Sequence, residues 1–238
     1  MDFVLSEEQN LLIETTRSFV KNELIQHEEL LEKTNDLPKE LYKEIKQKCR
    51  EVGLYACNMP KEYGGGNLNA FDLTLVEKEL GHTSLALAEI AWRPQNILMA
   101  CSGKLIDEYL KPATTGERKD CIAMTEPEAG SDLRGMKTNA VKSNDDWIIN
   151  GTKHFISNAH ISDFVVLFAV TGKDEKEKNL LSCFLVDLDL PGVEVAKGYD
   201  CVSHRGYVNN ILHFNDCKIP AKNILGKEHK GFELMNTW

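Results

Sequence analysis

The stretch Ile122-Ala123-Met124-Thr125-Glu126-Pro127-Glu128-Ala129-Gly130-Ser131-Asp132 runs from apolar residues into a turn that contains hydroxyl groups and a glycine. This pattern predicts a strand followed by a loop with an exposed backbone. Such a loop can present amides and hydroxyl groups to a phosphate or to the edge of a planar cofactor. A capped surface turn has the same composition, so the loop by itself leaves both interpretations open.

The chain before this stretch has apolar residues at helical spacing. A first helix is predicted to begin at Ser6-Glu7-Glu8-Gln9, a capping-box pattern that can satisfy the first free amides. Further helices are predicted over residues 38–52, 71–80 and 85–99, with Pro94 kinking or splitting the last one. Residues 1–118 are therefore expected to form an all-helical domain.

The helix predicted over residues 38–52 shows this periodicity most clearly. Its apolar positions form one stripe, and its opposite face carries lysine and glutamate; the stripe consists of Leu41, Ile45, Cys49 and Val52. Pro38 suits the first turn of a helix, and Gly53 suits a left-handed exit.

The pattern changes after Lys111-Pro112-Ala113-Thr114-Thr115-Gly116-Glu117 to short apolar runs separated by turn residues. Trp147-Ile148-Ile149, then Asn150-Gly151, then residues 152–156 predict a β-hairpin, because Asn-Gly accepts the positive φ angles of a tight turn. More strands are predicted at residues 164–170, 180–186, 193–197 and 210–214, with an exposed hairpin tip at 172–179. Successive antiparallel strands with little helix between them indicate a sandwich or small barrel over residues 119–226.

The predicted fold class is therefore α+β, with the helical domain first, the β-barrel or sandwich second, and the start of a further helical domain at residues 227–238. This last segment turns helical around Phe232, Leu234 and Met235, and no cap, glycine or proline closes it. We expect the natural polypeptide to continue, with a frayed tail as the alternative. Phe232 and Trp238 are expected to be exposed and to favour association.

The composition argues against several classes of function. A chain of 238 residues that is 42% hydrophobic and 27% charged is typical of a well-folded protein. Its net charge of -9, without a local basic patch, argues against nucleic-acid binding. The seven cysteines lack the short spacing of a zinc site, so we expect reduced thiols and no metal. No signal peptide and no apolar run near ~20 residues is present, which predicts a cytoplasmic protein with no membrane partner.

The turn at residues 124–132 resembles a family signature. It matches the Thr-Glu-Pro-x-Ala-Gly-Ser-Asp signature of the acyl-CoA dehydrogenase family, with Glu128 at the position that varies. Other family-like motifs follow in the expected order: Pro60-Lys61-Glu62-Tyr63-Gly64-Gly65, Leu110-Lys111-Pro112 with Gly116-Glu117, Asn150-Gly151-Thr152-Lys153, Phe155-Ile156-Ser157-Asn158, and Phe214 through Pro220. The resemblance covers essentially the whole chain and implies an FAD-dependent oxidoreductase of fatty acid metabolism.

The resemblance implies that the flavin ring of FAD lies against the strand domain. Met124 and Thr125 would meet the polar edge of the flavin through backbone and hydroxyl groups, and Ile122 would border the same ring. Ser131 would reach toward the pyrophosphate of FAD and the CoA part of the substrate, a task that suits a short hydroxyl side chain. Its alternative role is to cap the turn.

Phe155 and Ser157 match two further flavin positions of the family. The first is an aromatic residue on the flavin face away from substrate, and the second is a hydroxyl residue near flavin N5. Tryptophan and threonine are frequent there; phenylalanine keeps a stacking surface but loses the indole donor, and serine keeps the hydroxyl. Phe155 could instead be a core residue, because alternation within the predicted hairpin would bury it.

The resemblance also implies a mechanism. Family members remove one hydrogen from each of the α and β carbons of an acyl-CoA thioester: a glutamate takes the α proton, and the β hydrogen leaves as hydride to flavin N5. That glutamate lies on a third, helical domain in most of the family. We therefore expect no catalytic residue in this chain, do not expect Glu126 or Glu128 to replace the base, and expect the fragment alone to be inactive.

Partners and alternative functions follow from the same resemblance. The family is commonly a homotetramer and passes electrons to an electron-transfer flavoprotein, so both partners and the acyl-CoA substrate are implied for the complete enzyme. One alternative is a relative of the acyl-CoA oxidases or flavin monooxygenases, and another is a non-catalytic acyl-CoA- or protein-binding fragment. No role is assigned to His154, His160 or Arg134, which lie near the motifs.

Overall fold

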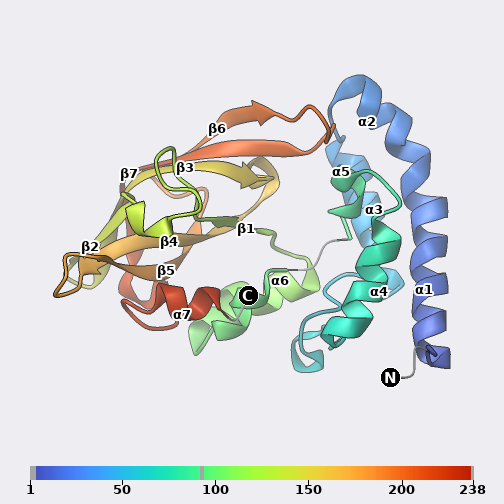
Figure 1. Ribbon diagram of the computed structural model, residues 1–238, viewed down its shortest axis with the longest axis horizontal. Helices are drawn as coiled ribbons and strands as arrows, with labels where there is room; N and C mark the ends of the chain where they lie inside the picture. Colours follow the sequence, from blue (N-terminus) through green and yellow to red (C-terminus); the bar gives the residue numbers. More distant parts are fainter. Residues whose placement is uncertain (1–3, 92–93, 237–238) are drawn as a thin grey trace. The chain divides into compact units, whose positions relative to one another are not determined.

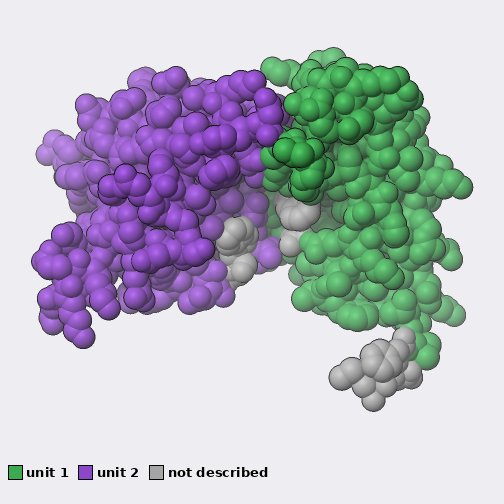
Figure 2. All heavy atoms as spheres, turned by 45° about the horizontal axis from the view of Figure 1, so that its top comes forward, with its two compact units in different colours: residues 1–94, 201–207 green, residues 95–200, 208–238 purple. Residues whose placement is uncertain are grey.

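The structure, a computed structural model, describes residues 4–91 and 94–236. The chain divides into two compact units (Figure 2). Met1–Pro94 and Cys201–Tyr207 form unit 1, and Gln95–Asp200 and Val208–Trp238 form unit 2. This division by packing differs from the boundary at residues 118 and 119 in the sequence, which remains a prediction about domain organisation.

Unit 1 consists of helices (Figure 1). Along the chain they are α1 (Glu7–Phe19), the π-helical turn η1 (Val20–Leu24), η2 (Ile25–His27), α2 (Glu28–Thr34), α3 (Lys39–Glu51), η3 (Lys61–Tyr63), α4 (Ala70–Leu80) and α5 (Leu85–Ala88). The predicted capping box is confirmed: the Gln9 amide donates to Ser6 Oγ at 3.1 Å, and the Ser6 amide donates to Gln9 Oε1 at 3.0 Å. Two of the first free amides of α1 are thereby satisfied.

Helix α3 confirms most of its predicted stripe. Ile45 and Cys49 are buried in the core of unit 1, and Leu41 packs partly against it. Val52 is 46% exposed, so its assignment to the stripe was wrong. It is the C-cap residue after the last helical residue, and the chain then leaves the helix through Gly53 at φ 76°.

The helix predicted over residues 85–99 was largely wrong. Helix α5 ends at Ala88, and the next element, the 3₁₀ helix η4 (Asn96–Ala100), belongs to unit 2. Pro94 lies between the two elements, which fits the predicted split. Residues 92–93 lie outside the described part of the chain.

The segment Cys201–Tyr207 belongs to unit 1, although it connects two strands of unit 2. The Gly206 amide donates to Asn35 Oδ1 at 2.9 Å, and Tyr207 packs against the helical core. A Cβ atom on Gly206 would lie 2.9 Å from Leu31 Cδ2. Residues far along the chain therefore complete the packing around α2.

Unit 2 contains short helices and one eight-stranded sheet (Figure 1). The helices after η4 are the π-helical turn η5 (Ile106–Leu110), α6 (Lys111–Thr115), the 3₁₀ turns η6 (Leu133–Gly135), η7 (Ala159–Ile161) and η8 (Ala221–Asn223), and α7 (Gly231–Met235). The strands are β1 (Asp120–Ala123), β2 (Asn139–Ser143), β3 (Asp146–Ser157), β4 (Phe164–Lys173), β5 (Asn179–Asp187), β6 (Val193–Asp200), β7 (Val208–Pro220) and β8 (Ile224–Leu225). Their order is β6-β7-β3-β2-β4-β5-β8, and β1 pairs with β4.

The sheet is mostly antiparallel, as predicted, and encloses the core of unit 2. Trp147 of β3 and Phe184 of β5 meet edge to face with ring centroids 5.2 Å apart, although two strands separate them in the sheet order. The sheet therefore curves over its own inner face. Two pairings, β1 with β4 and β2 with β4, are parallel and were not predicted.

The hairpin predicted at Asn150-Gly151 was wrong, because β3 runs without a turn from Asp146 to Ser157. The turn lies earlier, at residues 144–145, with Asn144 at φ 54°. Gly151 instead lies at a shift in the register between β3 and β7, with φ 148°. The Asn-Gly pair therefore lies opposite a β-bulge, in which β7 carries one residue more than β3.

The other predicted strands are confirmed as parts of β4, β5, β6 and β7. The exposed tip is confirmed between β4 and β5, where Asp174 Oδ1 accepts the amides of Lys176 and Lys178 at 2.8 and 2.9 Å. The predicted helix in the last segment is confirmed as the short α7, and Phe232 is 36% exposed. Trp238 lies outside the described residues.

Two further observations concern the described residues alone. None of their helices has the length and hydrophobicity needed to cross a lipid bilayer. The seven cysteines form no disulfide; six are buried and Cys201 is partly exposed.

Candidate cofactor-binding surface

Ile122 lies on β1, at the start of the predicted cofactor surface. It pairs with Val166 of β4 and is partly exposed, whereas its neighbours Cys121 and Ala123 are buried in the core. Because side chains alternate along a strand, Ile122 points to the face opposite the core. Met124 and Thr125 continue from this strand and are also partly exposed.

The loop after Thr125 is closed by the buried side chain of Glu126. Its carboxylate accepts the amide of Lys137 at 2.6 Å and the amide of Thr138 at 3.0 Å. Eleven and twelve residues separate these partners from Glu126. One carboxylate therefore fixes both ends of the loop, which makes Glu126 a structural residue of the signature.

Ser131 lies exposed in this closed loop. The neighbouring Asp132 caps the short η6 turn, because its Oδ1 accepts the Arg134 amide at 3.1 Å. Within the described part of the chain, the Ser131 hydroxyl has no hydrogen-bond partner. Capping is therefore the task of Asp132, and the Ser131 hydroxyl is available to a ligand.

Lys153 of β3 lies completely buried beside the loop. Its Nζ donates to Glu126 Oε1 at 2.8 Å and to the carbonyl oxygen of Met124 at 3.0 Å. Burial lowers the pKa of Lys153 to about 8, although the Glu126 carboxylate acts to raise it. Burial acts to raise the pKa of Glu126, but Lys153 and the amides of Lys137 and Thr138 outweigh it and hold that pKa below its ordinary value.

The carbonyl groups of Met124 and Thr125 are both occupied within the protein. Lys153 Nζ donates to the first, and the His154 amide donates to the second at 2.9 Å. Among the described residues, the Thr125 hydroxyl makes no hydrogen bond. With its acceptors paired inward, this part of the loop can offer donors to a bound molecule.

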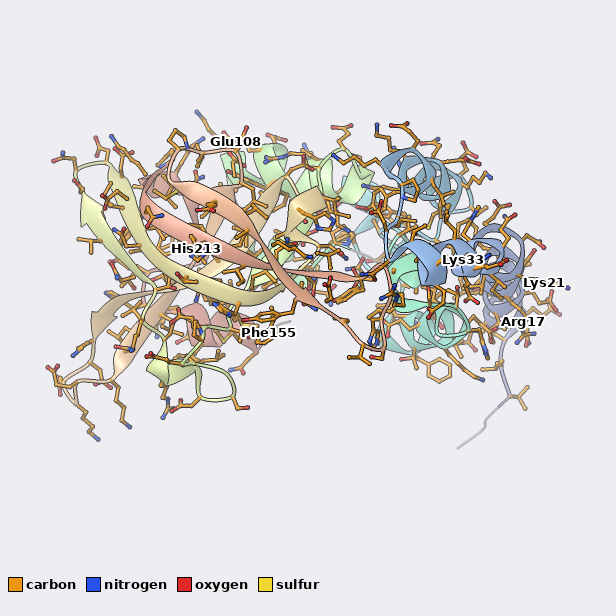
Figure 3. All side chains as sticks on the ribbon, turned by 90° about the horizontal axis from the view of Figure 1, so that it is seen from above. Arg17, Lys21, Lys33, Glu108, Phe155 and His213 are labelled. Carbon is orange, nitrogen blue, oxygen red and sulfur yellow. The ribbon has the colours of Figure 1, made fainter. Side chains whose placement is uncertain are left out.

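Phe155 projects from an irregular part of β3 (Figure 3). Lys153 pairs with Leu212 and Ile156 with Asn210, so β3 has an extra residue here relative to β7. Phe155 takes up this shift with a left-handed backbone, at φ 58°, and its side chain is 55% exposed. The alternative that Phe155 is a core residue is therefore wrong. A phenylalanine at positive φ is uncommon and costs backbone strain, which points to a functional constraint.

Tyr199 of β6 stacks on Phe155, with ring centroids 4.7 Å apart and an angle of 23° between the planes. Its hydroxyl lies 2.9 Å from His154 Nδ1. Tyr199 is 43% exposed, so the two rings form a partly exposed aromatic pair. The sequence prediction missed Tyr199, because Gly198 lies at a register shift between β6 and β7 that local patterns do not reveal.

Ser157 ends β3 and pairs with Asn209 of β7. It is partly exposed and lies two residues beyond Phe155. The structure therefore brings Met124 and Thr125 next to the segment that carries Phe155 and Ser157, through the bonds of Lys153 and His154. The assignment of all these residues to flavin contacts remains a prediction.

The buried Lys153 belongs to the motif Asn150-Gly151-Thr152-Lys153, but the sequence prediction gave it no role. Period-two alternation places it on the same face as Trp147 and Ile149, both of which are buried. A lysine in that position needs a buried anion, and this signal could have identified Glu126 as its partner.

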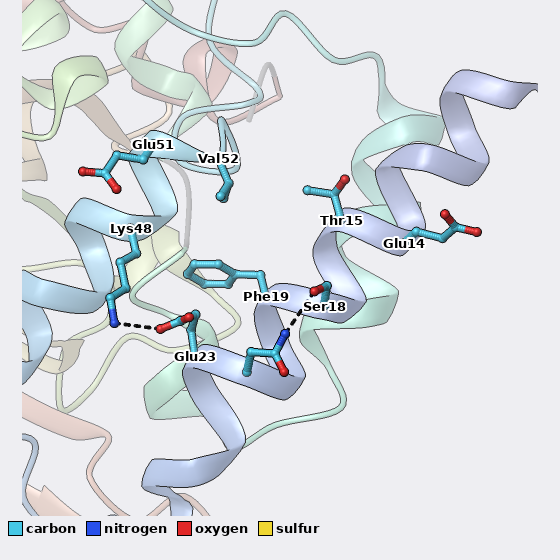
Figure 4. Close-up of a pocket in the computed structure, with 9 residues that line it drawn as sticks. Glu14, Thr15, Ser18, Phe19, Glu23, Lys48, Glu51 and Val52 are labelled. Carbon is cyan, nitrogen blue, oxygen red and sulfur yellow. Dashed lines mark hydrogen bonds and ion pairs between the residues drawn. The ribbon is translucent and has the colours of Figure 1, made fainter.

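A groove in unit 1 and the residues His160 and Arg134 are further candidate ligand contacts. A groove in unit 1 between α1 and α3 is lined by Thr15, Ser18, Phe19, Lys48 and Val52 among others (Figure 4). Its one ammonium is already paired, since Lys48 Nζ lies 2.8 Å from both Glu23 Oε2 and Glu44 Oε1. His160 faces Asn210 at 3.1 Å, and the carbonyl of Arg134 accepts the Asn179 amide group at 2.8 Å. Neither residue gains a role.

Comparison with known proteins identifies the family. The family model described as acyl-CoA dehydrogenase, N-terminal domain, matches residues 6–117, and the one described as acyl-CoA dehydrogenase, middle domain, matches residues 121–217. The chain belongs to the acyl-CoA dehydrogenase family. The predicted resemblance is thereby confirmed, and so is the predicted order of a helical region and a mostly antiparallel sheet domain.

Three relatives illustrate the match. It is 32% identical to the probable acyl-CoA dehydrogenase YngJ of Bacillus subtilis, over 98% of this chain and 62% of the relative. It matches the crystal structure of an acyl-CoA dehydrogenase from Geobacillus kaustophilus with a TM-score of 0.86 and 29% identity, over 100% of this chain and 63% of the other. A glutaryl-CoA dehydrogenase from Mycobacterium smegmatis, in complex with FADH2, matches with a TM-score of 0.83 and 25% identity, over 98% and 60%. The chain thus spans about three fifths of the length of these relatives.

Proposed function

We propose that this chain provides the flavin-binding wall of an FAD-dependent enzyme that oxidises an acyl-CoA thioester between its α and β carbons. One arrangement carries the proposal: the exposed Phe155 ring on strained backbone lies close in the fold to a loop with inward-paired carbonyl groups and available hydroxyl groups. The relative from Mycobacterium smegmatis in complex with FADH2 supports this assignment by analogy.

The residues fit the chemistry of a flavin. One edge of the isoalloxazine ring is rich in hydrogen-bond acceptors, and the Thr125 hydroxyl and amide are donors. The Phe155 ring has one face against Tyr199 and supplies a flat apolar surface. We assign the partly exposed Ile122 of β1 to the border of the bound ring. In this proposal Ser157 adds a hydroxyl beside Phe155, and Ser131 contacts the pyrophosphate of FAD and the CoA part of the substrate.

The chain's task is to bind and orient. When bound, FAD supplies the acceptor for the hydride that leaves the β carbon. The strand wall holds the ring in one orientation and keeps water from one of its faces, which favours the reaction because the reacting atoms are already placed. Tyr199 contributes by supporting Phe155 from behind.

The proposal places the catalytic base outside residues 1–238. Glu126 is buried in an ion pair and accepts two backbone amides, so it is held ionised for a structural task. Glu128 is exposed and paired with Lys137. Neither carboxylate is available to take a proton from a substrate carbon, which leaves the chain able to bind FAD but unable to turn over acyl-CoA alone.

For the complete enzyme, the proposal extends to an electron-transfer flavoprotein as electron acceptor and to a homo-oligomer, a dimer or tetramer. Both rest on membership of the family, because the chain covers only part of its relatives.

The test is a titration of the chain with FAD, followed by visible absorption, and then anaerobic addition of a panel of saturated acyl-CoA thioesters. We expect a protein-bound flavin spectrum that acyl-CoA does not bleach. Phe155→Ala should weaken FAD binding. Bleaching would show that a base is present after all, and rapid reoxidation by oxygen would then favour an oxidase. No flavin binding would contradict the proposal and favour the non-catalytic alternative.

A further inference from the structure

Lys153 connects the two parts of the proposed flavin surface. It lies on β3 directly before His154 and Phe155, and its Nζ reaches the Met124 carbonyl at 3.0 Å and Glu126 Oε1 at 2.8 Å. It is one of the largest side chains that are fully buried among the described residues. A charge in such a place is expensive to bury, so its retention calls for a reason beyond filling the core.

The direction of its bonds suggests that reason. The Met124 carbonyl accepts from Lys153, and the carbonyl of Thr125 accepts from the His154 amide at 2.9 Å. A peptide unit is planar, so a hydrogen bond that fixes a carbonyl oxygen also fixes the direction of the amide of the next residue. An apolar side chain at position 153 would fill the space but leave the peptide after Met124 free to rotate.

We infer that Lys153 is a positioning residue for the flavin, which orients the Met124–Thr125 backbone through the Met124 carbonyl, with Glu126 as its buried counter-ion. The inference rests on the proposed function. Glu126 in turn accepts the amides of Lys137 and Thr138, at 2.6 and 3.0 Å. Through Glu126, the Lys153 ammonium group is therefore connected to both ends of the loop.

The test compares FAD affinity with stability in the full 238-residue chain. The variants are Lys153→Met, Glu126→Gln and the neutral double variant Lys153→Met/Glu126→Gln. FAD affinity is measured by fluorescence titration, and stability by urea unfolding without FAD. The matched control is Lys137→Met/Glu128→Gln, which removes an exposed ion pair from the same loop.

A positioning role and a structural role of Lys153 predict different effects of the variants on FAD affinity and on the urea midpoint. If Lys153 orients the Met124 carbonyl, the double variant should unfold near the urea midpoint of the unchanged chain, because no buried charge is left unpaired, and yet bind FAD about tenfold more weakly. Glu126→Gln should lower the midpoint but keep FAD affinity within about threefold, since Lys153 can still donate to Met124. The control should change neither quantity.

Three outcomes would overturn the inference. If affinity follows stability across the variants, Lys153 is only a structural residue, and if the double variant binds FAD like the unchanged chain, the Met124 contact has no part in binding. If the double variant does not fold, the comparison of Glu126→Gln with Lys153→Met decides, and equal FAD affinities overturn the inference. Absence of FAD binding by the unchanged chain would instead contradict the proposed function, and the inference with it.

Discussion

Gly151 lies so close to Thr138 that a side chain at position 151 would have no room. A Cβ atom built on Gly151 would lie 2.6 Å from the Thr138 Cα, and the Gly151 backbone has φ 148°, which L-residues avoid. The contact joins β3 to the residue that precedes β2, next to the Glu126 carboxylate that accepts the Thr138 amide. The irregular pairing of β3 with β7 at Gly151 therefore lies directly against the closed loop.

Gly151→Ala is expected to destabilise the chain by roughly 2 kcal/mol or more, because it adds a clash to a strained backbone. The measurement is the free energy of unfolding in urea. Gly130→Ala is the control, since a Cβ atom at Gly130 meets nothing within 4 Å and its backbone is not left-handed. Equal stability of the two variants would mean that Gly151 does not lie against Thr138 as described.

Lys153 should make the stability depend on alkaline pH. Its pKa is lowered by burial from 10.5 to about 8, so between these values the unfolded chain keeps a proton that the folded chain has lost. Stability from this group therefore rises with pH, by roughly 3 kcal/mol at most between pH 8 and 10.5. The difference in unfolding free energy between the unchanged chain and Lys153→Met/Glu126→Gln measures it. A difference that stays flat over this range would contradict the assignment of Lys153 as a buried ammonium.

Glu126 should act in the opposite pH range. Its pKa is held below the ordinary value of 4.5, so its contribution to stability is complete above pH 4.5 and is lost as the pH falls through the lower folded value. Acid unfolding of the unchanged chain should therefore be steeper than that of Glu126→Gln, which has no carboxyl group to protonate at position 126. Equally steep acid unfolding of the two chains would show that folding does not lower the pKa of Glu126.

Tyr199 should matter more for FAD than for stability. Tyr199→Leu removes the ring that stacks on Phe155, and we expect FAD affinity to fall about threefold to tenfold, as befits the loss of one aromatic stack. Because Tyr199 is 43% exposed, its loss should change the free energy of unfolding by less than about 1 kcal/mol. Tyr199→Phe keeps the ring and should bind FAD normally. If the phenylalanine and leucine variants bind alike, the stack does not support the flavin site.

Cys201 should be the thiol that reacts first. It is partly exposed, whereas the other six cysteines are buried, and burial raises the pKa of Cys49 and Cys121 to about 12. A thiol reagent such as dithionitrobenzoate should therefore modify one cysteine quickly in the folded chain and the remaining six only after unfolding. Cys201→Ser should abolish the fast phase. A fast phase that survives this substitution would show that one of the buried thiols is accessible.

The features that could be predicted from the sequence are those that local chemistry decides. The capping box of Ser6 and Gln9 involves residues three apart, and the tip between β4 and β5 depends on Asp174 and its neighbours. The Asn-Gly pair was misread for a non-local reason. Asn150 exchanges hydrogen bonds with Asp216, 66 residues away, so its conformation depends on β7 and not on a turn of its own.

The candidate surface shows the same limit. The motif residues Met124, Thr125 and Phe155 were predicted from the family resemblance, and the fold places their segments side by side. Tyr199 could not be found in this way, because only the register between β6 and β7 brings it onto Phe155. Lys153 was not predicted either, because the expected turn at Asn150-Gly151 hid the alternation along the continuous β3 that places Lys153 on the buried face.

The segment Cys201–Tyr207 has a consequence for the order in which the protein can mature on the ribosome. Unit 1 begins with the first residues to be synthesised, but it lacks its Gly206 contact with Asn35 and the packing of Tyr207 until translation has passed residue 207. By then most of the strands of unit 2 have already been made. In many proteins the N-terminal domain completes its folding before the next domain is synthesised. Unit 1 of this chain cannot do so. Its helices must wait, with Leu31 incompletely covered, for a loop that is encoded among the strands.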